Sequence, residues 1–188
     1  MAPRPSAHCC PGCWPWARHG ARHRVEHRVS SEVSGDRPVL TSLDEAALES
    51  LTALEAAHGW ATAGSTSQLA ATLRSSTMWV VGQVVDDVVV GYAALERQPF
   101  EAELQAILVD ARWRGRGVAR RLLSEVVEQA RVWRSERLLL EVRAGNVSAI
   151  ALYRAAGFAE DGVRRGYYPP RQAGAVREDA LLMSLALA

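Results

Sequence analysis

A short apolar run that passes through a glycine-rich turn into a long amphipathic stretch is the feature that most constrains this chain. The apolar run covers residues 104–109, the turn covers 112–117, and a helical stripe follows. The first N–H groups of a helix have no partner within it, and its dipole adds about half a positive charge there. Glycines let the backbone approach an anion closely. The segment therefore predicts an anion cradle suited to a diphosphate, with added charge from Arg114, Arg116, Arg120 and Arg121.

The spacing differs from two better-known phosphate loops. The segment has no Lys followed by Ser or Thr, so it is not a Walker A loop, and it lacks the Gly-x-Gly-x-x-Gly of a dinucleotide fold. On spacing alone, an ordinary strand-turn-helix junction remains the alternative, because Gly and Arg are common in turns and helix starts.

The composition indicates one globular domain with some additional chain. Of 188 residues, 48% are hydrophobic and 23% are charged, and the formal net charge is +1. This balance does not favour nucleic acid or an acidic membrane surface as a direct partner, and no apolar run approaches the ~20 residues of a membrane span. The cysteines are confined to the first residues, which fits a reducing compartment. We expect a cytoplasmic protein.

Residues 1–36 differ from the rest of the chain. They hold four of the five histidines and all three cysteines, with little periodic apolar pattern. We interpret them as a disordered or mis-annotated N-terminal extension, and residues 37–188 as the folded domain. Cys10-x-x-Cys13 resembles half of a zinc site, but no second ligand pair has regular spacing, so we expect no metal.

From Val39 onward the periodicity predicts an α/β fold with a mixed sheet. Asp86-Asp87 indicates a hairpin turn, and Asn146 is a good helix N-cap. The expected strands are 39–40, 78–85, 88–97, 102–109, 138–143, 158–168 and 179–187, and the expected helices are 41 or 44 to 57, 68–74, the stretch from 118 through 133, and 146–157.

This order, with its motifs, resembles the GNAT acetyltransferase superfamily, whose pyrophosphate loop has the form Gln/Arg-x-x-Gly-x-Gly/Ala. The second half of the chain is similar to the RimI type, the ribosomal-protein alanine N-acetyltransferases. The motifs that carry the likeness are Arg114-Gly115-Arg116-Gly117-Val118-Ala119, Leu140 to Asn146, Ala149 to Tyr153, Gly157-Phe158, Arg164 to Pro169 and Arg177 to Ala180. The resemblance implies a mostly antiparallel sheet flanked by helices, with a splayed strand pair at an acetyl-CoA site.

The resemblance also implies how acetyl-CoA is held as cosubstrate. Strand backbone groups at Ile107, Leu108 and Val109 would contact the acetyl carbonyl and pantetheine, and amides placed there can stabilise an oxyanion. Asn146 would make a further contact. The pyrophosphate would lie on Arg114, Gly115, Arg116, Gly117, Val118, Ala119 and Arg120.

In the same way, Glu141 matches the general base of these enzymes and Tyr153 the general acid. An α-ammonium with a pKa near ~8 must lose a proton before it attacks a thioester, and a tyrosine can protonate the departing thiolate. Glu103 is a rival base, because other branches of the superfamily use a glutamate on that earlier strand. Apart from the resemblance, a strand glutamate more often pairs with an arginine, and a helix tyrosine is more often a core residue.

The acceptor implied by the resemblance is the N-terminus of a protein, in particular an N-terminal alanine or similar small residue of a small-subunit ribosomal protein. Trp60, Tyr167 and Tyr168 are the candidate walls of its groove. The segments 59–62 and 170–176 depart from the family pattern, and both fall on the acceptor side. The acyl donor is therefore better defined than the acceptor.

Two alternatives remain open from the sequence. The chain could acetylate a small-molecule amine or an internal lysine, or it could be a non-catalytic module that binds acetyl-CoA. Retention of both Glu141 and Tyr153 argues against the non-catalytic module. We expect a monomer or a weak dimer.

Deletion of residues 1–35 tests the predicted domain boundary. Because this segment lacks a periodic apolar pattern, the shortened chain is expected to keep its thermal unfolding temperature and its activity. Circular dichroism and enzyme assays on the two forms measure this, and a large loss of either property would contradict the boundary.

Overall fold

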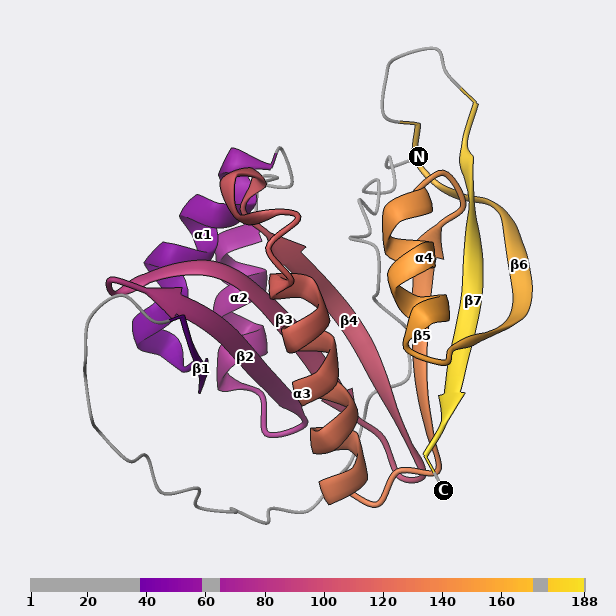
Figure 1. Cartoon of the computed structure of the whole chain (residues 1–188), viewed down its shortest axis with the longest axis horizontal. Helices are drawn as coiled ribbons and strands as arrows, with labels where there is room; N and C mark the ends of the chain where they lie inside the picture. Colours follow the sequence, from indigo (N-terminus) through magenta and orange to yellow (C-terminus); the bar gives the residue numbers. More distant parts are fainter. Residues whose placement is uncertain (1–37, 59–64, 171–175, 188) are drawn as a thin grey trace, which may run out of the picture.

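The computed structural model describes residues 38–58, 65–170 and 176–187, and these build a seven-stranded sheet with helices on both faces (Figure 1). The strand order is β1-β2-β3-β4-β5-β7-β6. Neighbouring strands are antiparallel except for the pair β4 and β5. The elements are β1 (Val39–Ser42), α1 (Leu48–Ala57), α2 (Ser65–Arg74), β2 (Met78–Val85), β3 (Val88–Arg97), β4 (Glu101–Val109), α3 (Val118–Val132), β5 (Arg137–Arg143), α4 (Val147–Ala155), β6 (Ala159–Tyr168) and β7 (Glu178–Ala186).

The observed elements agree with the predicted order, and the differences lie at their ends. The turn between β2 and β3 has positive φ at Asp86 (48°) and Asp87 (60°), as tight hairpins require. The first helix does not begin at Thr41. β1 extends to Ser42, and the Asp44 side chain caps a 3₁₀ turn, η1 (Glu45–Ala47), before α1 begins. Pairing of β1 with β2 explains this shift, because Thr41 and Ser42 join that ladder.

The only parallel pair in the described sheet, β4 and β5, is short. Residues 101–104 of β4 pair with 137–140 of β5, although the strands run on to Val109 and Arg143. Beyond Leu104 and Leu140 the two strands diverge, as Figure 1 shows. This confirms the expected mixed sheet with a splayed strand pair.

The helix that connects β4 to β5 determines which chain segments lie beside this opening. A parallel pair needs a crossover connection, and α3 supplies it. The carboxyl ends of β4 and β5 therefore lie at the same edge of the sheet, and the chain enters α3 and α4 from that edge. Two helix N-termini thus lie near the opening.

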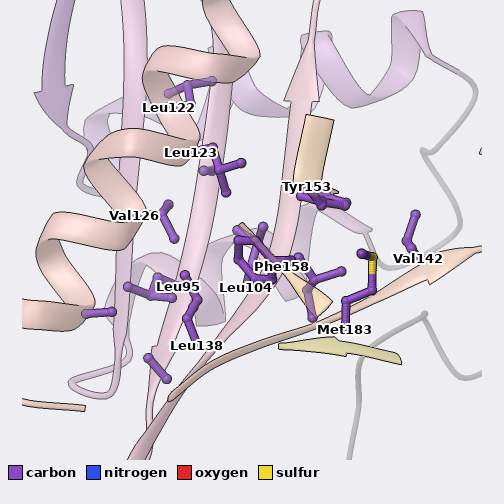
Figure 2. Close-up of a cluster of buried hydrophobic side chains, with 14 of the residues drawn as sticks. Leu95, Leu104, Leu122, Leu123, Val126, Leu138, Val142, Tyr153, Phe158 and Met183 are labelled. Atoms are coloured by element: carbon purple, nitrogen blue, oxygen red, sulfur yellow. The ribbon is translucent and has the colours of Figure 1, made fainter. Parts of the chain in front are cut away.

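Two apolar clusters hold these layers together, one on each face of the sheet. On one face, Leu122, Leu123 and Val126 of α3 pack against strand residues that include Leu95, Leu104 and Leu138 (Figure 2). On the other face, α1 and α2 cover β2 and β3 through Leu51, Leu54 and Leu69. Each fully buried leucine contributes roughly 1.5–3 kcal/mol, so the position of α3 is strongly fixed. None of the described helices is long and apolar enough to cross a membrane.

Candidate active site

The segment predicted to form an anion cradle lies between β4 and α3. After a 3₁₀ turn, η2 (Ala111–Trp113), Gly115 and Gly117 adopt left-handed φ values of 73° and 79°. Gly117 is the N-cap of α3 and provides no side-chain cap for the first N–H groups of the helix. A Cβ atom at either glycine would have no atom within 4 Å, so the loop surface is open. Exposed N–H groups at a helix start suit an anion.

The cradle arginines do not all face the open side. Arg116 is exposed and lies 4.9 Å from the Trp113 ring centre, and Arg120 is also exposed. Arg121 is also exposed; its Nε donates to Oε1 of the fully buried Gln83 at 3.1 Å, and its Nη2 donates to the Arg116 carbonyl of the loop at 3.5 Å. That buried acceptor on β2 could not be foreseen from the local sequence.

The carboxyl end of β4 is held by two side chains. His58 Nε2 lies 2.6 Å from the Val109 carbonyl oxygen, and Arg114 Nε donates to the same oxygen at 3.4 Å. Leu108 packs towards α1 and α2, whereas Ile107 packs towards α3. Ile107 and Leu108 lie on the part of β4 that is no longer paired with β5, but both still pair with β3 on the other edge. The Val109 carbonyl already has partners.

Asn146 is the N-cap of α4, as expected. Its Oδ1 accepts from the Ala149 N–H at 3.3 Å and from the Ser148 hydroxyl at 3.2 Å. Any ligand contact of this side chain must therefore come from its amide NH₂ group.

A groove between α3 and α4 begins beside the cradle. Its volume is about 320 Å³, and it is lined by Arg120, Leu123, Val127, Leu152 and Ala155, among others. Its apolar floor comes from two helices, so the groove depends on their packing and was not predicted.

Glu141 is the first residue of β5 beyond the segment paired with β4. Leu140 and Val142 point into the core with α3 and α4, so Glu141 points to the opposite face of the sheet. Its side chain is 11% exposed, and its Oε1 lies 3.1 Å from Arg164 Nη1. Arg164 thus holds the carboxylate in place. Arg164 lies in the motif Arg164 to Pro169, and the sequence alone indicates no role for it.

Glu103 lies near Glu141 on the adjacent strand and is also largely buried. Gln98 Nε2 donates to its carboxylate at 3.0 Å. Burial, together with the charges of Glu141 and Glu96, raises the pKa of Glu103 to about 7. The two glutamates that the sequence offered as alternative bases therefore belong to one cluster.

Tyr153 comes from α4 on the other face of the sheet. It is 5% exposed, and its ring lies 5.7 Å from that of Phe158, as can be followed in Figure 2. Burial raises the pKa of its hydroxyl well above the ordinary value of 10, and the nearby Tyr168 adds to this. Such a hydroxyl keeps its proton at neutral pH. Glu141 on β5 and Tyr153 on α4 thus lie on opposite faces of the sheet, beside the opening.

The three residues expected to form the walls of the acceptor groove differ in their positions. Trp60 lies outside the described residues. Tyr167 is half-buried near Glu141, and burial followed by that carboxylate raises its pKa. Tyr168 is only 6% exposed, and the Arg143 guanidinium lies 4.4 Å from its ring centre. Tyr168 therefore contributes more packing than open surface.

Arg143 also ties β5 and the start of α4 to β7, a role that the sequence did not indicate. Its Nη1 donates to Glu178 Oε2 at 2.8 Å, and Glu178 Oε1 accepts from the Gly145 N–H at 2.8 Å. The start of α4 is thereby tied to the start of β7.

Within the described ranges, no group of three or more His, Cys, Asp or Glu side chains is placed to hold a metal ion, and Cys10 and Cys13 lie outside those ranges.

Residues 43–158 match the family model described as "Acetyltransferase (GNAT) family". The chain belongs to this family. Its members are acetyltransferases that use acetyl-CoA as cosubstrate, as the resemblance implied.

Sequence and structure relatives fall in the same family. The chain is 45% identical over 92 residues to N-alpha-acetyltransferase RimI from Mycobacterium tuberculosis, covering 47% of this chain and 56% of that protein. It is 40% identical over 100 residues to the ribosomal protein bS18-alanine N-acetyltransferase of Salmonella typhimurium, covering 53% and 66%. The chain thus spans between about half and two thirds of the length of these two relatives.

Among solved structures, the ribosomal-protein-S18-alanine N-acetyltransferase of Escherichia coli superimposes with a TM-score of 0.73 at 28% identity. The match covers 81% of this chain and 95% of that chain. This agreement confirms the predicted fold class and the likeness to the RimI type.

The raised pKa of Glu103 predicts a pH dependence of stability. The folded protein holds a proton on Glu103 up to about pH 7, whereas the unfolded chain releases it near the ordinary value of 4.5. The free energy of unfolding should therefore fall as the pH rises between these values, by about 1–3 kcal/mol. Urea unfolding across that range measures this fall, and Glu103→Gln should abolish it.

Glu101→Gln is the matched control, because Glu101 lies on the same strand and its carboxylate is only 3.8 Å from Arg137 at the surface. An unchanged pH slope in Glu103→Gln would contradict the assignment.

Proposed function

We propose that this protein is an N-terminal protein acetyltransferase. It transfers the acetyl group of acetyl-CoA to the α-amine of an N-terminal alanine, or a similar small residue, of a small-subunit ribosomal protein. The observation that carries the proposal is the position of Glu141 and Tyr153 on opposite faces of the sheet, beside the opening between β4 and β5 and next to the anion cradle. The names of the relatives support the acceptor.

In this proposal the cradle holds the donor. The N–H groups at the start of α3, with Arg116 and Arg120, bind the pyrophosphate, and Asn146 contributes from the start of α4. Ile107 and Leu108 lie on the edge of β4 beside the opening and line the path to the reacting carbonyl, and the N–H group that points away from β3 stabilises the developing oxyanion. The groove beyond Arg120 leaves room for the rest of the donor.

The chemical step uses one proton acceptor and one proton donor. Glu141 takes a proton from the ammonium of the acceptor, directly or through a water molecule. The amine nitrogen then forms a bond to the acetyl carbon, the carbon–sulfur bond breaks, and the nitrogen releases its second proton to water to give the neutral amide. Tyr153, whose hydroxyl is protonated at neutral pH, gives that proton to the departing sulfur. Arg164 orients Glu141 throughout.

The clustered carboxylates of Glu103 and Glu141 favour a cationic acceptor, since an ammonium would offset their mutual repulsion. Tyr167 would form one wall of the acceptor groove, with Trp60 as a further proposed wall. We keep the cytoplasm as the expected location and a monomer or weak dimer as the expected state.

Mass spectrometry of the reaction tests this function. The protein is mixed with acetyl-CoA and an N-terminal peptide of the small-subunit ribosomal protein, and thiol release is followed in parallel. We expect one acetyl group on the free α-amine and none on an N-terminally blocked peptide that contains lysine. Transfer to the blocked peptide or to small amines would move the assignment to another acceptor, and binding of acetyl-CoA without any transfer would favour a non-catalytic module.

Substitution of the two glutamates identifies the base. Glu141→Gln should lower kcat by about a hundredfold or more, while the Kd for acetyl-CoA changes by less than about twofold, because the base does not contact the pyrophosphate. Glu103→Gln is the matched control, with the same chemical change on the adjacent strand. A larger loss in Glu103→Gln than in Glu141→Gln would transfer the base role to Glu103.

A further inference from the structure

The strand β6 contains a wide irregularity next to the Glu141 site. Arg164 pairs with Ala180 of β7, and Tyr168 pairs with Glu178. Residues 165–167 therefore lie opposite the single residue Asp179. Extra residues on one strand form a bulge, which redirects side chains and interrupts the ladder.

The bulge changes where the tyrosines point. In a regular strand, successive side chains lie on opposite faces. Yet the rings of Tyr167 and Tyr168 lie only 5.0 Å apart in an edge-to-face arrangement. The Arg164 guanidinium lies 5.4 Å from the Tyr167 ring centre, and Arg164 also contacts Glu141. The bulge thus brings Tyr167 to the face that carries Glu141.

Two charged side chains from the β7 side hold this bulge. Asp179 Oδ1 accepts from the Gly166 N–H at 2.7 Å. Arg177 donates through Nε to the Gly166 carbonyl and through Nη2 to the Tyr167 carbonyl. Gly166 has a φ of 58°, which strongly disfavours branched side chains. Three charge-assisted hydrogen bonds and one left-handed residue therefore define the shape of the bulge.

We propose that Arg177 and Asp179 are positioning residues for the acceptor: they hold the bulge at Gly166 and so keep Tyr167 beside Glu141. This inference rests on the proposed function and adds to it which residues shape the acceptor groove. Both side chains bind the backbone of the bulge and act through Tyr167.

A pair of substitutions at one position tests the proposal. Asn tolerates left-handed φ, whereas Val does not, so Gly166→Asn should keep the activity of the wild type and Gly166→Val should lose it. We expect Gly166→Val to lower kcat/KM for the acceptor peptide by about tenfold to a hundredfold, with the KM for acetyl-CoA within about twofold of wild type. Equal losses in the two variants, or an unchanged acceptor kcat/KM in Gly166→Val, would overturn the proposal.

Asp179→Asn provides a second test that introduces no backbone strain at Gly166. Like Gly166→Val, it should lower kcat/KM for the acceptor peptide. Asp161→Asn is its matched control, because Asp161 lies on the neighbouring strand β6 and its carboxylate contacts Arg137 at 2.9 Å, on the surface. The control should leave both KM values unchanged. A loss in Asp161→Asn as large as in Asp179→Asn would refute a specific role of Asp179.

Ultraviolet titration of the tyrosines gives a readout that needs no acceptor. Tyr167→Phe identifies the step that belongs to Tyr167. Glu141 contributes to the raised pKa of Tyr167, so Gly166→Val should make this tyrosine ionise at lower pH. Absence of transfer by the wild type would refute the proposed function, whereas an unchanged Tyr167 titration in Gly166→Val would refute the positioning role.

Discussion

The early end of the hydrogen-bonded ladder between β4 and β5 is the constraint on which the rest of this structure depends. If the parallel pairing continued to Val109 and Arg143, it would use the backbone N–H and C=O groups on the facing edges of both strands. Because pairing stops at Leu104 and Leu140, the sheet keeps an opening that its two faces share. In the proposed mechanism, Glu141 on one face and Tyr153 on the other serve a single reaction.

The two halves of the sheet are each held by other contacts, so the opening does not close. On one side, α3 packs its apolar stripe on β3 and β4, and α1 and α2 cover the opposite face. On the other side, β5 pairs with β7 along its whole length. The cost of the missing ladder is offset by core packing, which is typical of sites that must admit a ligand between rigid elements.

The distribution of charge follows the same division. The donor side presents helix N–H groups and arginines, which suit a diphosphate. The acceptor side presents the carboxylates of Glu103 and Glu141, balanced in part by Arg164. In the proposed function, the negatively charged donor and the positively charged acceptor are each attracted to one side. The β6 bulge completes the acceptor side by turning Tyr167 towards Glu141.

The sequence by itself determined the order of the elements, the cradle and the cap at Asn146, because these depend on neighbouring residues: turn glycines, apolar periodicity and side-chain caps. The resemblance supplied Glu141 and Tyr153. Only the tertiary structure decided that Arg121 bonds the buried Gln83, that Arg164 contacts Glu141, and that Glu103 lies in the same cluster. These contacts join strands and helices far apart in the chain, and their geometry depends on sheet register and burial, which local patterns do not encode.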